Sequence, residues 1–203
     1  MDANEYIQKK YDLDLTKKSP IIIRGSRHID LVQLFAELQF KVGAEIGVDR
    51  GRYSEVICQA NPGVKLFCID PWIVYGGYIE MRLQDRLNKN KQATIRRLKP
   101  YGCEIQQAFS IDAVKQIEDG SLDFVFIDGN HVYEYVVEDI AEWSKKVRSG
   151  GIVSGHDYMQ SRDPIKSPCH VIKAIDGYTT SYEINPWFVL SNDRCPSWMW
   201  VKS

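Results

Sequence analysis

Several features that define other protein classes are missing from this 203-residue sequence. It has no hydrophobic run of about 18 residues, so it predicts no membrane-spanning helix and no membrane partner. Its formal net charge is −1, so no global basic field points to nucleic acid as a partner. The N-terminal stretch MDANEYIQKKYDLD is too polar and acidic for a secretory signal.

The sequence also lacks paired cysteine motifs. Its five cysteines are scattered, odd in number and form no C-x-x-C pattern. Cys58, Cys68 and Cys103 lie in apolar stretches, which favours small buried core residues. We therefore expect a reducing, cytoplasmic setting.

One glycine-rich pattern is incomplete in an informative way. The stretch VGAEIGVDRGRYS predicts a buried strand over Val42–Ile46, a turn over Gly47–Gly51 and a helix over Arg52–Ala60. A dinucleotide site requires G-x-G-x-x-G, but here the middle position is Asp49 and the last is an arginine. A carboxylate is electrostatically wrong for a pyrophosphate cradle, so the pattern argues against a dinucleotide.

The same stretch still indicates a nucleotide-binding crevice. Glu45 ends the first strand, and Asp70 ends the next strand, LFCID, nineteen residues after Gly51. A strand, a glycine-bearing turn, a helix and a second-strand acid about 20 residues on form the layout of such a crevice. Asp70 is then placed to accept from the ribose hydroxyls. An ordinary tight strand-to-helix turn is the alternative.

Two later strands each end in a pair of polar residues. The strands are Leu122–Ile127 and Ile152–Ser154. The pairs that follow them are Asp128 with His131 and His156 with Asp157. Parallel strands would bring both pairs to the edge that holds Glu45 and Asp70. Burial of these acids and histidines is costly without counter-charge, which a bound cation or a cationic ligand such as a sulfonium would offset.

Other stretches predict local structure. A helix over Asp30–Phe40 is expected to be capped by Asp30, and Gly150-Gly151 is expected to end the helix before the strand Ile152–Ser154. Ser110 follows a strand over Gly102–Gln107 and is expected to cap a helix; its hydroxyl would also lie where an adenine edge could be read.

Two loops are expected beside the crevice. The aromatic residues Trp72, Tyr75 and Tyr78 follow Asp70 and would offer apolar surface to a ligand, or pack on one another. The segment Met159–Cys169 contains several serine and proline residues and is a candidate for a loop that gates the substrate.

These motifs together resemble a known family. The stretches AEIGVDRGRYS, FCIDPW, DFVFIDGNHVYEYVVEDI and GGIVSGHDY resemble the class I S-adenosylmethionine (SAM)-dependent methyltransferase superfamily. More narrowly, they are similar to the bacterial family that includes the macrocin-type sugar O-methyltransferases of antibiotic biosynthesis. The resemblance covers about residues 40 to 160 and does not fix the substrate.

The resemblance implies roles for particular residues. Glu45, Gly47 and Gly51 would line the methionine end of the cofactor, Asp70 would hold the ribose, and Ser110 would lie near the adenine. Asp128 would lie at the junction of cofactor and acceptor. In metal-dependent relatives the positions of Asp128, His156 and Asp157 hold magnesium. Two carboxylates suit that ion, whereas histidine is more usual for transition metals, so the metal stays open.

The expected fold is a Rossmann-like three-layer α/β sandwich with a mostly parallel seven-stranded sheet. A helix over His170–Tyr178 and strands over Trp187–Ser191 and Ser197–Lys202 would complete it, the last two as an antiparallel hairpin. We expect a single domain over residues 1–203, with a helical leader over 1–40 and a cofactor-binding core over 41–203. In the leader, Glu5–Tyr11 could form a helix and Ile21–Ile23 an extended segment.

The predicted activity is methyl transfer from SAM to a hydroxyl of a sugar or other small molecule. His131 would act as the general base with Asp128 at the reacting centre, or a divalent metal such as Mg²⁺ would lower the hydroxyl's pKa. A dehydrogenase or a non-catalytic nucleoside-binding protein are the alternatives. The sequence does not name the acceptor, and a homo-oligomer stays open.

Overall fold

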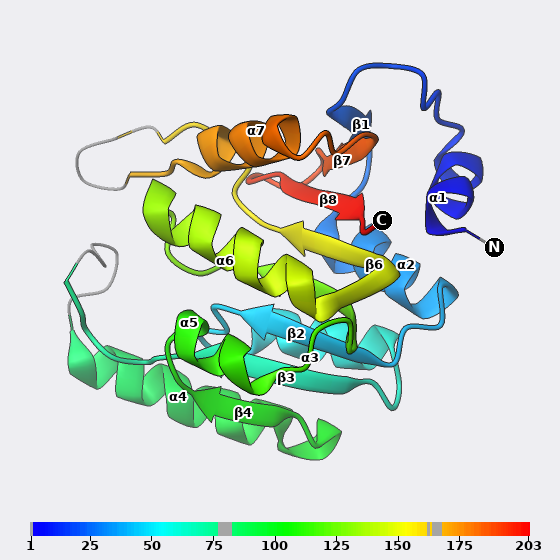
Figure 1. Ribbon diagram of the computed structural model, residues 1–203. Coiled ribbons are helices and arrows are strands. Elements are labelled where there is room, and N and C mark those ends of the chain that lie inside the picture. The colour runs from blue at the N-terminus through cyan, green and yellow to red at the C-terminus, as the bar shows by residue number, and fades with distance from the viewer. Residues whose placement is uncertain (1, 77–82, 162, 164–167) are drawn as a thin grey trace.

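The fold is built on one central sheet. The computed structural model describes residues 2–76, 83–161, 163 and 168–203. Within these residues the sheet contains eight strands, shown in Figure 1. They are β1 (Ile21–Ile23), β2 (Val42–Ile46), β3 (Lys65–Asp70), β4 (Glu104–Gln107), β5 (Leu122–Ile127), β6 (Val147–Gly155), β7 (Trp187–Leu190) and β8 (Ser197–Val201).

The strand order is β1-β7-β8-β6-β5-β2-β3-β4. All neighbouring pairs are parallel except those of β8, which runs antiparallel to both β6 and β7. The chain winds outward through β3 and β4 on one side of β2 and through β5 and β6 on the other. The order therefore reverses between β2 and β5, and ligands of open α/β sheets bind at such a point.

Helices cover both faces of the sheet. They are α1 (Ala3–Tyr11), the π-helix η1 (Arg27–Leu31), α2 (Val32–Glu37), α3 (Arg52–Ala60), α4 (Gln84–Leu98), the 3₁₀ turn η2 (Lys99–Tyr101), α5 (Ser110–Ala113), the 3₁₀ turn η3 (Val114–Gln116), α6 (Tyr133–Lys146) and α7 (Val171–Ser181). Helices α2, α3 and α4 pack on one face, and α5, α6 and α7 pack on the other.

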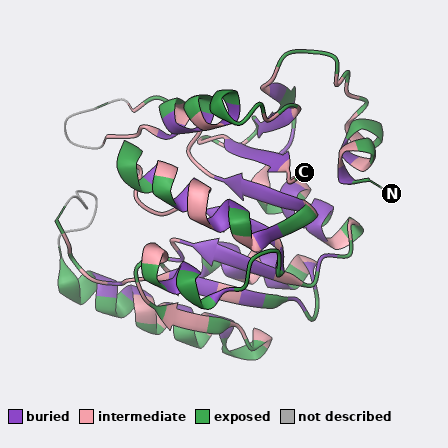
Figure 2. Cartoon of the chain, viewed as in Figure 1, coloured by how far each residue is buried: buried purple, intermediate pink, exposed green. Residues whose placement is uncertain are grey.

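Alternation along the strands explains the two-sided core. In β5, Phe124 and Phe126 join the cluster under α2 and α3, whereas Val125 and Ile127 join the cluster under α6 and α7. Successive side chains of a strand point to opposite faces, so a strand buried on both faces is apolar throughout. Figure 2 shows the central strands largely buried, whereas exposed residues lie on the helices, in the connecting loops and at the start of β6. The predicted three-layer fold is confirmed.

The N-terminal segment contributes to the sheet as well as to the helices. The predicted helix and extended segment are present as α1 and β1. Strand β1 pairs in parallel with β7, so it adds an eighth strand to the seven that were expected. Asp30 does not cap a helix there. It lies inside η1, where its Oδ2 accepts from the backbone N–H of Ser26, and Ser26 occupies the cap position.

Two further local predictions were wrong. Gly150 and Gly151 lie within β6 and do not end α6, which stops at Lys146. A Cβ on Gly151 would come within 2.4 Å of the carbonyl oxygen of Asp123, so glycine is needed where β6 crosses an irregularity in its pairing with β5. Ser110 is the first residue of α5, so the cap position belongs to Phe109 and not to Ser110. No side chain makes a cap hydrogen bond at this helix start.

Candidate active site

The floor of the site is a contact between two backbones at the sheet's reversal point. Gly47 follows β2 with φ +88°, and Asp128 follows β5. The N–H of Asp128 donates to the carbonyl of Ile46. A Cβ on Gly47 would lie 2.0 Å from the carbonyl oxygen of Asp128. Only glycine allows both this φ and this approach, so the position requires it.

A cleft of about 860 Å³, including its open mouth, begins at this floor. It is lined by Ile46, Gly47, Asp49, Ile69, Asp70, Pro71, Trp72, Ile73, Tyr75, Leu87, Phe109, Ser110, Ile111, Asp128, Gly129, Asn130, Tyr135, Glu138 and Asp139. Apolar walls with a few convergent polar groups are typical of small-molecule and cofactor sites. Four of the predicted cofactor residues line it, namely Gly47, Asp70, Ser110 and Asp128.

Asp70 is fixed by backbone groups at the end of β3. Its Oδ2 accepts from the N–H of Asp49 at 2.9 Å, and its Oδ1 accepts from the N–H of Trp72 at 2.8 Å. Burial raises the pKa of Asp70, and the hydrogen bond from Asp49 partly offsets that shift. Asp49 and Trp72 both have positive φ, at 49° and 44°. Such backbone geometry in non-glycine residues is costly and collects at functional sites.

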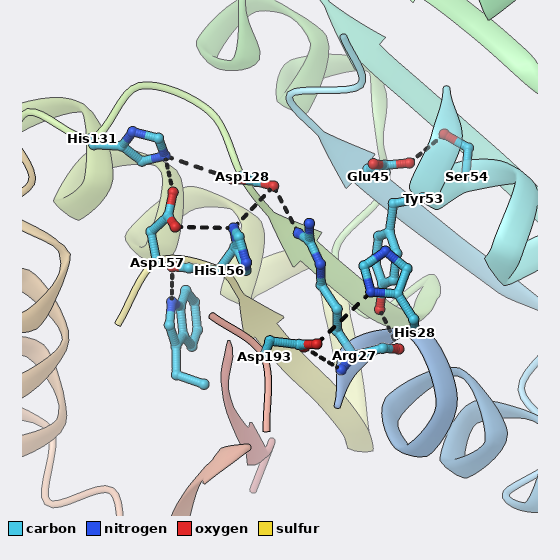
Figure 3. A network of polar contacts seen from close by, with 11 residues as sticks. Arg27, His28, Glu45, Tyr53, Ser54, Asp128, His131, His156, Asp157 and Asp193 are labelled. Atoms are coloured by element: carbon cyan, nitrogen blue, oxygen red, sulfur yellow. Dashed lines mark hydrogen bonds and ion pairs between the residues drawn. The ribbon is translucent and has the colours of Figure 1, made fainter. Parts of the chain in front are cut away.

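Glu45 and Gly51 lie behind the cleft and do not line it. The carboxylate of Glu45 accepts from the hydroxyl of Ser54 on α3 (Figure 3). Burial raises the pKa of Glu45 to about 8, partly offset by this hydrogen bond. Gly51 has φ +68° at the start of α3 and donates its N–H to Val48. Both residues therefore shape the turn beneath the cleft.

Two of the three expected loop aromatics, Trp72 and Tyr75, line the cleft. Tyr78 lies outside the described residues, as does part of the expected gating loop Met159–Cys169. The described residues of that loop give no evidence for or against the predicted gating role. Tyr75 also makes an edge contact with Phe109, with ring centroids 5.2 Å apart.

Charged side chains meet where β5 and β6 end, beside the cleft (Figure 3). His131 Nε2 lies 3.0 Å from Asp157 Oδ2 and 3.6 Å from Asp128 Oδ1. His156 Nδ1 lies 3.2 Å from Asp157 Oδ1 and 3.5 Å from Asp128 Oδ2. The two predicted polar pairs therefore form one cluster, and Asp128 is the member that also lines the cleft.

The N-terminal segment adds a cation to this cluster. Arg27 of η1 donates from Nη1 to Asp128 Oδ2 at 3.0 Å. Its guanidinium lies over the rings of Tyr53 and Phe126, 5.1 and 5.7 Å from their centroids. Its backbone N–H donates to Asp193 in the β7–β8 connection at 2.7 Å. The N-terminal segment and the β7–β8 connection, for which the sequence predicted no functional residue, thus both contribute to the site.

The protonation states follow from these contacts. Burial alone would raise the pKa of Asp128, but hydrogen bonds from His131 and His156 outweigh it and hold the pKa well below its usual range. The same balance lowers the pKa of Asp157. For His156, burial would lower the pKa, but the bonds to Asp128 and Asp157 raise it to about 9. At neutral pH two carboxylates therefore face an imidazolium and a guanidinium.

The donor set fits a divalent cation, with one change from the prediction. Ligand atoms of Asp128, His131 and Asp157 all lie within 4.8 Å of one another. Two carboxylate oxygens and an imidazole suit a divalent metal somewhat softer than Mg²⁺. This set contains His131 where His156 was expected. His156 and Arg27 pair with the same carboxylates and supply positive charge there themselves.

Sequence reasoning missed Arg27, Asp139 and Asp193. Arg27 reaches Asp128 across 101 residues of chain, and no local pattern marks such a contact. Asp139 did carry a signal, because an acid on the buried stripe of an amphipathic helix is unusual. It is 7% exposed and lines the cleft.

The fold and the site define a Rossmann-like α/β domain with a largely apolar cleft and an adjacent cluster of acids and histidines. Residues 44–158, more than half of the chain, match the model of a family described as a methyltransferase domain. The chain belongs to this family, as the sequence motifs predicted.

Individual relatives are distant. The chain is 23% identical over 119 residues to the "uncharacterized protein y4gI" of Sinorhizobium fredii; the match covers 58% of this chain and 12% of that protein. Among solved structures, an O-methyltransferase family protein from Burkholderia thailandensis has a TM-score of 0.59 at 13% identity, covering 87% of this chain and 58% of its own. TomG from Streptomyces achromogenes is an O-methyltransferase involved in tomaymycin synthesis and was solved with SAM. It has a TM-score of 0.60 at 17% identity, and the match covers 100% of this chain and 90% of TomG. These structures show the same fold.

Within the described residues, the helices are too short or too polar to cross a membrane.

Proposed function

We propose that this protein transfers a methyl group from SAM to a hydroxyl of a sugar or other small polar molecule. One observation carries the proposal: Asp128 lines the cleft on one side and joins the histidine and aspartate cluster on the other. A methyl donor in the cleft would therefore present its sulfonium next to groups that can receive a hydroxyl proton. A cleft for binding alone would not need such groups.

The cofactor would lie along the cleft from Gly47 to Ser110. The peptide at Gly47, which lines the cleft, would accommodate the methionine end. Asp70, held by two backbone N–H groups, would accept from the ribose hydroxyls. The SAM-bound state of TomG supports this choice of cofactor. We further propose that residues 1–203 act as one methyltransferase domain whose N-terminal 40 residues complete the acceptor side through Arg27.

The reaction would be an in-line displacement in which acceptor oxygen, methyl carbon and sulfur are aligned, so positioning is the main contribution. His131 would take the hydroxyl proton, and Asp157, 3.0 Å from its Nε2, would stabilise the imidazolium that forms. Asp128 would hold the acceptor near the methyl group. If a divalent metal is used, Asp128, His131 and Asp157 would hold it, and it would lower the pKa of a coordinated hydroxyl.

Titration with S-adenosylhomocysteine by calorimetry tests the cofactor assignment. We expect binding in Mg²⁺, in Mn²⁺ and in a chelator, because Gly47, Asp70 and Ser110, which would hold the cofactor, lie outside the cluster. Metal uptake that is lost in Asp157→Ala would support the metal-assisted form. Ligand binding without metal uptake would leave His131 as the base. The absence of ligand binding under all three conditions would overturn the proposal.

Replacement of Asp128 tests the acceptor side. Asp128→Ala should abolish methyl transfer to any hydroxyl acceptor that the wild type accepts in a panel of sugars and small alcohols. Asp112→Ala is the matched control, because Asp112 is an exposed acid that pairs with Lys115 on the surface. Full activity of Asp128→Ala would remove the cluster from the reaction.

A further inference from the structure

Asp139 is the buried acid of the cleft that the proposed mechanism does not use. It lies on α6, is 7% exposed and lines the cleft together with Ser110, Phe109 and Tyr135. Burial raises its pKa to about 7, partly offset by a hydrogen bond from Ser110. No lysine or arginine pairs with it among the described residues. A buried acid without a counter-charge is costly, so a group that donates to it would stabilise the site.

The hydrogen bonds around Asp139 have a fixed direction. The indole N–H of Trp143, which can only donate, donates to Ser110 Oγ at 2.7 Å. The Ser110 hydroxyl then donates its own proton to Asp139 Oδ1. Within the described part of the chain, Asp139 Oδ2 takes no hydrogen bond. The chain Trp143 to Ser110 to Asp139 therefore leaves one carboxylate oxygen as an unused acceptor.

The surroundings of this oxygen suit a flat ring. Ile69, Phe109 and Ile111 line the cleft, and Tyr75 lies with its ring at 72° to that of Tyr135, centroids 6.3 Å apart. Gly129 lies directly beside the carboxylate, since a Cβ there would be 3.3 Å from Asp139 Oδ2. Asp70, the expected ribose partner, lines the same cleft. A nucleoside held at Asp70 would thus place its base between these walls.

We infer that Asp139 is the specificity-determining residue for the nucleobase, and that its Oδ2 accepts a hydrogen bond from the 6-amino group of adenine. This inference rests on the proposed function and changes the role predicted for Ser110. Ser110 is a positioning residue, because its only proton is directed to Asp139. The site is therefore set to bind a donor at the 6-position and to reject a carbonyl there.

The substitution Asp139→Asn inverts this preference. The Ser110 proton needs an acceptor, so we expect the new amide to turn its carbonyl oxygen to Ser110 and its NH₂ group to the cleft. A donor then faces the 6-position, which suits the 6-oxo group of hypoxanthine and opposes the amino group of adenine. The change is nearly isosteric and removes a buried charge, so the fold should tolerate it.

The test is a calorimetric comparison, at a pH well above 7 so that Asp139 is ionised, of S-adenosylhomocysteine with S-inosylhomocysteine, which carries a 6-oxo group. For the wild type we expect about tenfold or stronger preference for the adenosyl ligand, since a buried charged acceptor left unpaired is costly. For Asp139→Asn we expect that ratio to fall by at least about tenfold, or to reverse. Asp139→Ala, which has neither group, should bind both ligands with similar affinity.

Glu134→Gln is the matched control, because Glu134 is an exposed acid of the same helix that is not among the cleft-lining residues; its ratio should equal that of the wild type. An unchanged ratio in both Asp139 variants would overturn the inference and leave Asp139 a structural residue. Equal binding of both ligands by the wild type would also overturn it while the methyltransferase proposal stands. If the wild type binds neither ligand, the proposed function itself fails.

Discussion

At the scale of single residues, the site depends on one glycine more than on any charged group. At Gly47 the backbone needs a positive φ and the space that a Cβ would fill is taken by the carbonyl of Asp128. These are two separate requirements, and another glycine in the chain satisfies only the first. Gly63 has φ +82°, but a Cβ there would meet nothing within 4 Å.

Gly47→Ala should therefore be far more disruptive than Gly63→Ala. We expect Gly63→Ala to lower the free energy of unfolding by about 1 to 2 kcal/mol, the usual cost of a left-handed alanine. Gly47→Ala should lower it by about 3 kcal/mol or more and abolish binding of S-adenosylhomocysteine, because the clash displaces Asp128. Urea unfolding and calorimetry measure both effects. Equal losses in the two variants would show that the contact with Asp128 is unimportant.

Glu45 should make stability depend on pH. Its pKa is raised by burial to about 8, against about 4.3 in an unfolded chain. The folded state therefore holds a proton that the unfolded state releases, and stability falls as the pH rises from about 4.3 to 8. Glu45→Gln removes this dependence.

We therefore expect Glu45→Gln to gain stability relative to the wild type, on the order of 3 kcal/mol, between pH 5 and pH 8. Chemical denaturation of both proteins at the two pH values measures it. Glu118→Gln serves as the control because Glu118 is exposed on the surface, and it should show no such gain. A pH-independent difference between Glu45→Gln and the wild type would mean that Glu45 is ionised when folded.

At the scale of elements, the short strand β1 sets the position of the helix that follows it. Its pairing with β7 leads the chain directly into η1, and η1 carries Arg27 to Asp128. The β7–β8 connection holds the same helix through Asp193. An edge strand of three residues thus does more than extend the sheet, since it leads into the helix that brings a cation to Asp128.

Arg27→Met tests this arrangement. Methionine keeps the apolar contact with Tyr53 and Phe126 but leaves Asp128 without its guanidinium partner, so we expect kcat to fall at least about tenfold while the Kd of S-adenosylhomocysteine changes much less. Arg24→Met, an exposed arginine of the same segment, is the control and should behave as the wild type. A matching loss in both variants would place the effect on the segment as a whole.

The elements themselves were largely predictable. The apolar strands β2 and β5 and helix α3 lie where the pattern predicted them, with the same bounds. The errors share a cause: at Gly150-Gly151, Asp30 and Ser110 the residue type is compatible with two local structures, and a partner outside the predicted element decides between them. The carbonyl of Asp123 leaves room only for glycine in β6, Asp30 accepts from the N–H of Ser26, and Asp139 accepts from the hydroxyl of Ser110.

The candidate site was predictable only where residues end strands. Asp70, Asp128, His131, His156 and Asp157 could be grouped because parallel strands end at one edge of a sheet. Arg27 and Asp193 come from other segments, and their approach to the cluster depends on packing that a sequence pattern does not encode. Local periodicity predicts that a strand exists, but not which distant side chain will meet its end.

At the scale of the whole molecule, ligand binding should be visible as stability. A ligand that binds only the folded state at 100 times its Kd adds about 2.7 kcal/mol. For a chain of this size that corresponds to a rise in Tm of about 5 to 10 °C. Thermal unfolding with S-adenosylhomocysteine measures it, with adenine alone as the control that cannot reach Asp70. An unchanged Tm at high ligand concentration would contradict binding of the ligand to the folded protein.

The pairing of β2 with β5 has a consequence for how the protein is made. At the floor of the cleft Gly47 lies against Asp128. A nascent chain whose β5 has not yet left the ribosome therefore contains the glycine turn but cannot form the cleft. Non-local strand pairing of this kind forms late and slowly. The cofactor would therefore bind only chains in which β2 and β5 are already paired, and its binding would report that the central sheet has formed.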